Sequence, residues 1–225
     1  MLEPTLLLGI DTCGPMGSVA LGRTTGSGGV EILGQTELEG RSYSTTLVAA
    51  IADLLAASGF KVLDLGAIVA VSGPGSFTGV RIALAAVKGL AEATQVPVVA
   101  LSRLEILARK AGGPVSALDA HRGEVFLRTD EPARELLAGA RELAAIDPVP
   151  ARIAICDDAA AAVLGAAWPA AEMVRTAPPN AADALELGAV RVAAGEFADV
   201  AELDGHYLRR SDAEIFGEMA VRPLT

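Results

Sequence analysis

One stretch, residues 69–81, constrains the fold of this chain more than any other. It starts as an apolar run, passes through a turn dense in Gly, Pro, Ser and Thr, and leads into a second run of apolar and small residues. This succession predicts a buried strand, a tight loop and a helix. Gly73 and Gly75 permit backbone conformations that other residues avoid, and Ser76 or Thr78 can cap the helix.

The start of this helix has two interpretations, which the residues alone leave open. Free backbone N–H groups at a helix N-terminus suit a phosphate or another anion. A Gly-rich corner also occurs where a chain only needs to turn tightly from a strand into a helix. The stretch is neither a P-loop nor a nucleophile elbow, because no Gly-Lys-Ser/Thr follows it and Phe77 stands at the nucleophile position.

Three strands precede the first helix of the chain. We expect them at residues 5–10, 17–21 and 30–38, paired antiparallel, before a helix at residues 43–58. Dinucleotide-binding folds alternate strand and helix from their first strand, so this order argues against such a fold. The helix predicted at residues 76–94 is apolar or small on nearly every side, which is typical of a helix buried on two sides. We therefore expect it to lie between the sheet and either a neighbouring helix or another protein chain.

Gly112-Gly113-Pro114 interrupts the chain, and we place a lobe boundary there. Residues 1–111 then form an N-terminal lobe, and residues 112–225 form a smaller lobe that starts like a shortened copy of the first. In the second lobe we expect strands at residues 115–118, 124–128 and 152–156, and helices at residues 133–145, after Asp157-Asp158 and at residues 181–194.

The composition narrows the classes of function. The 225 residues carry a formal net charge of −10, which disfavours direct binding of nucleic acid. The two cysteines, Cys13 and Cys156, form no Cys-x-x-Cys motif, so the sequence predicts neither a disulfide framework nor a structural zinc site. The N-terminus lacks the basic region of a signal peptide, and no apolar segment is long enough to span a bilayer. We therefore expect a cytoplasmic protein that does not contact a membrane.

Polar residues follow two of the predicted strands. Asp11 and Thr12 either hold a phosphate or a magnesium-bound water, or simply satisfy the N–H groups of a hairpin turn. Asp119 and His121 end a strand of the second lobe, where they suit acid–base chemistry or a structural hydrogen bond. The two histidines of the chain, His121 and His206, are far apart in the sequence, which excludes a metal site built on two histidines at helical spacing. No catalytic constellation emerges from these residues.

Five blocks of the sequence resemble the bacterial TsaB (YeaZ) family of tRNA threonylcarbamoyladenosine (t6A) biosynthesis. They occur in the family's order and span most of the chain, although residues 129–204 carry no match. The most specific block is Ser72-Gly73-Pro74-Gly75-Ser76-Phe77-Thr78-Gly79-Val80-Arg81-Ile82 with Lys88-Gly89-Leu90-Ala91. The others are Ile10-Asp11-Thr12 with Ser18-Val19-Ala20-Leu21, Arg41-Ser42-Tyr43-Ser44, Leu118-Asp119-Ala120-His121-Arg122-Gly123-Glu124-Val125 and Tyr207-Leu208-Arg209-Arg210.

The resemblance implies an α/β, actin-like ATPase fold of the ribonuclease-H-like type, with two lobes of which the second is shortened. It also implies a non-catalytic scaffold or activator subunit that pairs with the related subunit TsaD. TsaD-type proteins transfer the threonylcarbamoyl group to adenosine 37 of tRNAs that read ANN codons, and a TsaE-type ATPase joins that complex. By the same resemblance, tRNA meets this chain only through the complex, and the chain alone forms a homodimer.

TsaD-like proteins carry a His-x-x-x-His metal motif after the strand that follows the central helix. In this sequence Arg103 and Leu107 stand at those two positions. Arginine is a fixed cation and leucine has no lone pair, so neither can bind the metal. The second-lobe Gly-rich adenosine loop of the superfamily is also not visible. We therefore expect no metal, no catalytic residue and no cofactor of the chain's own.

The family's two first-lobe helices pack against their counterparts in TsaD. The corresponding segments here are residues 43–58 and 76–94, whose small residues would let partner helices approach closely. The expected interface residues are Leu47, Ala50, Leu54, Ala83, Ala86, Val87 and Gly89.

The alternative is an ATP-binding enzyme of the actin-like or sugar-kinase class, with ATP and Mg²⁺ held at Asp11, Thr12 and Asp119. The candidate phosphate loops of this fold are formed by Asp11, Thr12, Gly73, Gly75, Ser76, Thr78 and Asp119.

Overall fold

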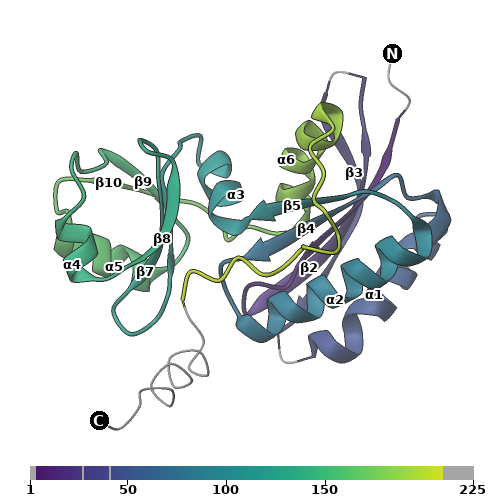
Figure 1. Cartoon of the computed structure of the whole chain (residues 1–225), viewed down its shortest axis with the longest axis horizontal. Helices are drawn as coiled ribbons and strands as arrows, with labels where there is room; N and C mark the ends of the chain where they lie inside the picture. Colours follow the sequence, from purple (N-terminus) through teal and green to yellow (C-terminus); the bar gives the residue numbers. More distant parts are fainter. Residues whose placement is uncertain (1–3, 27, 41, 210–225) are drawn as a thin grey trace, which may run out of the picture.

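The computed structural model describes residues 4–26, 28–40 and 42–209. Within them the chain forms two five-stranded sheets, one in each of two lobes, and helices pack against both sheets (Figure 1). Arg41 and Arg210, which belong to two of the family-like blocks, lie outside the described residues, and so does the rest of the predicted second lobe beyond Arg210.

The first sheet has the strand order β3-β2-β1-β4-β5. As the sequence predicts, its first three strands pair antiparallel, and β4 and β5 extend the sheet in parallel with β1. The bounds are β1 Leu6–Asp11, β2 Met16–Thr24, β3 Val30–Glu39, β4 Ala67–Gly73 and β5 Val98–Ser102, with α1 at Tyr43–Ala57, a 3₁₀ helix at Val62–Asp64 and α2 at Phe77–Thr94.

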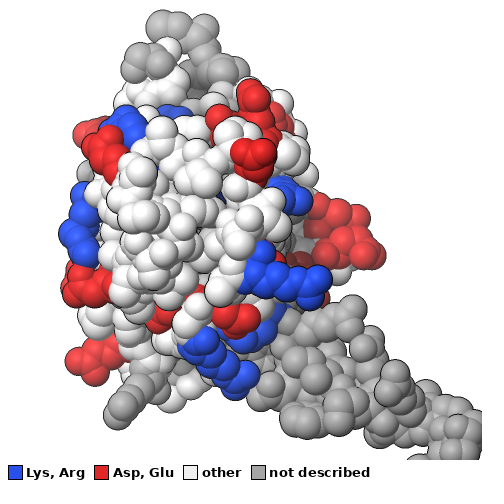
Figure 2. Space-filling model, turned by 90° about the vertical axis from the view of Figure 1, so that its left-hand side faces the viewer, with Lys and Arg blue, Asp and Glu red and all other residues white. Residues whose placement is uncertain are grey.

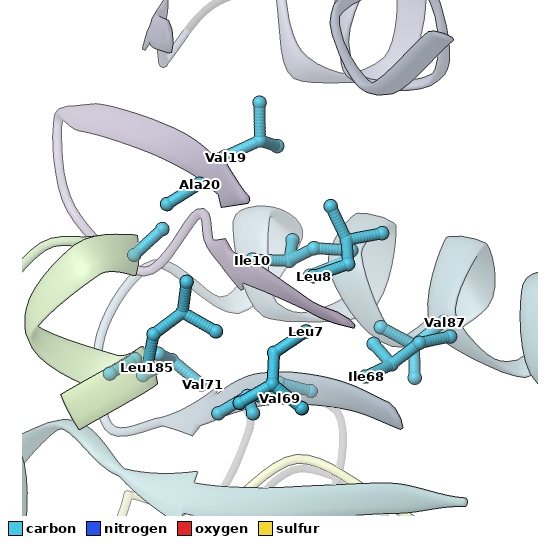
Figure 3. Packing of buried hydrophobic residues seen from close by; sticks show 14 of the residues in the cluster. Leu7, Leu8, Ile10, Val19, Ala20, Ile68, Val69, Val71, Val87 and Leu185 are labelled. Atoms are coloured by element: carbon cyan, nitrogen blue, oxygen red, sulfur yellow. The ribbon is translucent and has the colours of Figure 1, made fainter. Parts of the chain in front are cut away.

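Strands β1 and β4 are buried along their whole length because helices cover both faces of the first sheet. Helices α1 and α2 lie on one face and α6, Ala181–Ala194, on the other (Figure 1). Val87 of α2 and Leu185 of α6 pack among the side chains of β1 and β4 (Figure 3). The approach of α6 is close, since a Cβ on Gly188 would lie 2.5 Å from Val69 Cγ2.

The second sheet repeats the topology of the first, with the order β8-β7-β6-β9-β10. Strands β6, β7 and β8 are antiparallel neighbours, and β9 and β10 follow in parallel with β6. The bounds are β6 Ser116–Asp119, β7 Val125–Thr129, β8 Arg134–Ala138, β9 Arg152–Ile155 and β10 Glu172–Arg175, with α4 at Ala140–Ala144 and α5 at Asp158–Ala167. The second lobe is therefore a smaller copy of the first, as the order of the predicted elements suggests.

The helix predicted at residues 133–145 is wrong in its first half, which forms β8. Ala, Arg, Glu and Leu favour a helix in isolation, but pairing with β7 overrides this preference. Only residues 140–144 are helical, as α4.

The last helix of each lobe packs against the sheet of the other lobe. Helix α3, Arg103–Lys110, follows the last strand of the first sheet and packs against β6, β7 and β9 of the second as well as against β4 and β5. Helix α6 follows β10 but packs against the first sheet. The structure thus differs from the predicted division at residues 111 and 112, because α6 belongs to the first lobe by its packing.

Residues 198–209, which we call the strap, return across both lobes (Figure 1). Ala198 N donates to Val98 O at 2.8 Å, and His206 N donates to Ser72 O at 2.7 Å. Arg209 Nη2 then donates to Ala120 O in the second lobe at 2.7 Å. The strap therefore ties the ends of β4 and β5 to the turn after β6.

Candidate functional site

A cleft with a volume of about 1170 Å³ lies between the lobes. Its walls are the loop after β1, the start of α2, the turn between β6 and β7, and the strap. Among the residues predicted to form phosphate loops, Gly75, Ser76 and Asp119 line this cleft. Asp11 and Thr12 are buried behind its wall.

The two candidate phosphate loops of the first lobe pack directly on each other. Thr12 Oγ1 donates to Gly79 O at 2.7 Å, and Ser76 N donates to Cys13 O at 2.7 Å. A Cβ on Gly75 would collide with Cys13 O, and one on Gly79 would collide with Thr12 O. These glycines are therefore required for the close approach of two backbone segments.

The remaining polar groups of this corner also have structural partners or face outward. Ser76 caps α2 as predicted, because its Oγ accepts a hydrogen bond from Gly79 N at 3.2 Å. Gly73 has a φ of +120°, and its missing side chain leaves room for the strap at His206 O. Thr78 is exposed in the first turn of α2. The tight corner thus accounts for the glycines of this stretch.

Asp11 and Arg103 form a buried ion pair beside the cleft. Arg103 Nε lies 3.4 Å from Asp11 Oδ2, and the two side chains are 9% and 1% exposed. Asp11 Oδ1 accepts a hydrogen bond from Cys13 N at 2.8 Å, whereas Asp11 Oδ2 and Arg103 Nε have no hydrogen-bond partner within the described residues. Arg103 reaches this position because it is the first residue of α3. A cation of the chain itself therefore neutralises the aspartate.

The groups around this ion pair are poor nucleophiles. Burial, followed by the charge of Asp11, raises the pKa of the Cys13 thiol well above its ordinary value. Burial also raises the pKa of the Cys156 thiol, and burial and the Asp11 charge raise the pKa of Tyr43 to about 12. Burial alone would lower the pKa of the Arg103 guanidinium, but the charge of Asp11 and smaller contributions from Cys13 and Cys156 together outweigh it and raise that pKa. The site offers a permanent cation and no ionised thiol or phenol at neutral pH.

Asp119 and His121 come together at the rim of the cleft, in the second lobe. His121 N donates to Asp119 Oδ1, and His121 Nδ1 lies near Asp119 Oδ2, both at 2.8 Å. The imidazole is 87% exposed and makes no hydrogen bond to a hydroxyl or thiol within the described residues. The Asp119 side chain therefore fixes both the backbone and the imidazole of His121 in this turn. His121 and Arg122 both have positive φ values, 61° and 57°, in the turn between β6 and β7.

The structure corrects part of the predicted partner interface. Leu47, Leu54, Ala83 and Val87 are buried in the core of the first lobe, so no partner can reach them in the folded chain. Ala50 and Ala86 are half-buried and Gly89 is exposed. The physical reason is that a helix apolar on nearly every side does not reveal which face meets its own sheet.

A cluster of polar side chains around Glu135, which the sequence did not predict, connects the lobes on the other side of the strap. Glu135 Oε2 accepts a hydrogen bond from Ser102 Oγ at 2.6 Å and lies 2.8 Å from His206 Nε2, and Glu135 Oε1 accepts one from Arg128 Nη1 at 2.8 Å. These residues are far apart in sequence and share no motif. No local signal in the sequence could have brought them together.

Two kinds of feature are absent from the described part of the chain. No group of three His, Cys, Asp or Glu side chains lies together in a way that could hold a metal ion. No helix there is long and apolar enough to cross a membrane.

Two lobes of the same topology around a central cleft define an α/β protein of the actin-like, ribonuclease-H-like fold. Residues 32–154 match the family profile described as TsaD, tRNA N6-adenosine threonylcarbamoyltransferase. The chain is 36% identical to the t6A biosynthesis protein TsaB of Escherichia coli K12 over 126 residues, 53% of this chain and 52% of that protein. The chain thus spans about half the length of this curated relative, and less of two others named TsaB.

Two further similarities extend over nearly the whole chain. An uncharacterized protein of Mycobacterium tuberculosis H37Rv is 30% identical over 217 residues, 95% of this chain and 96% of that protein. The solved structure of YeaZ from Pseudomonas aeruginosa matches with a TM-score of 0.65 and 29% identity, covering 91% of this chain and all of that one. The chain belongs to the TsaB (YeaZ) family.

Proposed function

We propose that this chain is a non-catalytic subunit of the machinery that forms t6A on tRNA, and that a TsaD-type protein docks on α1 and α2. The relatives named as t6A biosynthesis proteins support the pathway. The match to the TsaD profile supports a partner of related fold, because related lobes offer related helical faces. The tRNA and a TsaE-type ATPase then engage through the complex.

The proposal rests on the composition of the outer face of α1, which is mostly small and uncharged. Its exposed positions Thr45, Val48, Ala49, Ala52 and Ala56 carry no charge, and Asp53 is the exposed charged residue of this helix. Val48 is 67% exposed and lies among small uncharged residues of this face, and a contiguous apolar patch is typical of a surface that another protein covers. We place the interface on this face, together with Gly89 and the half-buried Ala50 and Ala86, instead of on the buried residues.

We also propose that the chain works without a nucleotide or metal ion of its own. The hydrogen bond from Thr12 Oγ1 to Gly79 O and the close approach of Thr12 O to Gly79 support this, since they occupy the space between the two candidate phosphate loops. The Arg103 guanidinium beside Asp11 supports it further, because it stands where the alternative would need magnesium. Calorimetric titration with ATP and Mg²⁺ tests the proposal, and tight binding by the isolated chain would favour the ATP-binding enzyme instead.

The docking proposal is tested with Ala52→Arg in α1. We expect the variant to fold normally, because Ala52 is exposed, and to lose at least about tenfold in affinity for a co-expressed TsaD-type partner. Co-purification and a t6A-formation assay measure the loss. Analytical ultracentrifugation of the chain alone shows whether the same face forms the homodimer, in which case the variant is a monomer.

The matched control is Ala162→Arg, an exposed alanine of α5 in the second lobe. The outer end of that lobe also shows a broad area without charged side chains (Figure 2). Partner binding should survive this substitution. Loss of binding in Ala162→Arg but not in Ala52→Arg would move the interface to the second lobe and contradict our assignment.

A further inference from the structure

Arg103 has a free edge that faces the cleft. Its Nε points to Asp11, and its two terminal nitrogens make no hydrogen bond within the described residues. The only atoms of this ion pair that are both buried and unpartnered are Asp11 Oδ2 and Arg103 Nε, so the terminal nitrogens are open to the cavity that Arg103 lines. A guanidinium that is nine-tenths buried and retains unused N–H donors is rare without a ligand.

We propose that the interlobe cleft binds a small monocarboxylate with an apolar body, and that its carboxylate sits end-on against the terminal nitrogens of Arg103. The planar guanidinium offers two parallel N–H groups along this edge, which match the two oxygens of a carboxylate. This inference concerns a ligand of the chain itself and does not depend on a TsaD-type partner.

The walls of the cleft set the shape and polarity of the ligand's body. Leu118 and Phe126 from the second lobe, Pro74 from the loop before α2, and Leu208 from the strap line the cavity. A ligand bound to Arg103 therefore shares the cavity with these apolar side chains. An aliphatic or aromatic body of a few carbons therefore fits better than a sugar or a polyphosphate.

The charges around the cleft favour one negative charge over several. Asp11 already balances the charge of Arg103, and Glu124 pairs with Arg209. Among the other lining residues, the negative charges of Glu39, Asp119 and Asp157 outnumber the positive charge of Arg122 at the rim. The side chains of the two aspartates accept hydrogen bonds from backbone N–H groups, from His121 N to Asp119 Oδ1 and from Ala160 N to Asp157 Oδ1. A phosphate dianion or a nucleoside triphosphate would meet stronger repulsion than a carboxylate.

Titration calorimetry of the full chain with acetate, hexanoate and benzoate, each beside its neutral amide, tests the proposal. We expect at least one carboxylate to bind about tenfold more tightly than its amide, since the amide lacks the charge-assisted pair with Arg103. Inorganic phosphate is the third arm. If no acid binds more tightly than its amide, the proposal is overturned, and if phosphate binds more tightly than every carboxylate, the ligand class is wrong.

The double variant Asp11→Asn/Arg103→Met removes the binding charge and its counter-ion together, which avoids leaving one buried charge unpaired. It should bind acids and amides alike. Arg122→Ala, at the exposed rim, is the control that retains the preference for acids. Retained discrimination in the double variant would show that Arg103 is not the binding residue.

A second readout keeps the test decisive if the double variant does not fold. Cys156 lines the cavity and is half-buried, so a bound ligand should slow its alkylation by N-ethylmaleimide in the unmodified chain. Cys156→Ser identifies the signal, because Cys13 is buried. Equal alkylation rates with and without a saturating carboxylate would place the ligand outside the cleft and overturn the proposal.

Discussion

The two lobes contain equivalent turns with opposite surroundings. Asp11 ends the first strand of the first sheet, and Asp119 ends the first strand of the second. Each aspartate accepts a hydrogen bond from the backbone N–H two residues later, at 2.8 Å in both lobes. The hydrogen bond between each aspartate and its turn and the strand order around it are therefore the same, although His121 and Arg122 have positive φ values and Cys13 and Gly14 do not.

The difference lies in the side chain that each aspartate meets. Asp11 is buried against Arg103, which is equally hidden, whereas Asp119 meets the exposed imidazole of His121. Arg103 stands at the start of α3, the helix that the first lobe sends into the second. The aspartate of the first lobe is therefore buried and paired with an arginine because α3 packs on its turn. The equivalent aspartate of the second lobe faces an exposed side chain.

The largest difference in stability between the two lobes is expected when each of the two aspartates is substituted. Asp11→Ala leaves the Arg103 guanidinium buried beside no counter-ion and should lower the free energy of unfolding by about 3–5 kcal/mol. Asp119→Ala removes a contact with the exposed His121 imidazole and should cost about 1 kcal/mol or less. Urea denaturation of both variants measures the difference.

The matched control for this prediction is Asp11→Asn/Arg103→Met. Removing both charges should recover most of the stability that Asp11→Ala loses, because no unpaired charge remains. Equal losses for Asp11→Ala and Asp119→Ala would mean that water in the cleft solvates Arg103 as well as it solvates His121.

The helices that follow the equivalent strands β4 and β9 provide the second test. Gly79 of α2 abuts Thr12 O, so Gly79→Ala should destabilise the chain by about 1–3 kcal/mol through overpacking. Gly165 of α5 has open space around its Cβ position, so Gly165→Ala should stabilise by about 0.5–1 kcal/mol through helix propensity. Thermal unfolding separates the two signs, and a shift in the same direction for both would show that the Thr12 loop moves aside freely.

The same contrast explains which features were predictable from sequence. The Gly-rich turn, the three antiparallel strands and the Ser76 cap follow from local chemistry and were confirmed. Strand β8 was not predictable, since its helix-forming residues are held extended by pairing with β7. The partner of Asp11 was equally hidden, because the sequence identifies Arg103 as a non-ligand but does not show that α3 carries it to the first strand's end. Contacts made by α3, α6 and the strap are long-range and leave no periodic signal.

The smallest change in stability is expected at Glu135, where the two lobes and the strap meet. Burial alone would raise the pKa of the Glu135 carboxyl, but hydrogen bonds from His206, Ser102 and Arg128 outweigh it and hold that pKa below its ordinary value of 4.5. A depressed pKa in the folded state means that the ionised group stabilises the fold above that ordinary value, and that this contribution is lost as the pH falls through the folded pKa.

Glu135→Gln should therefore lower the free energy of unfolding by about 1–2 kcal/mol at pH 5.5, where the wild-type carboxylate accepts charge-assisted hydrogen bonds. At pH 3 the difference between the two proteins should shrink, because the wild-type side chain is increasingly protonated. Urea denaturation at both values measures it. The exposed Glu172, which pairs with Arg152 within the second sheet alone, is the control: Glu172→Gln should change little at either pH. A Glu135→Gln difference that stays constant with pH would show that Glu135 joins the lobes by shape and not by charge.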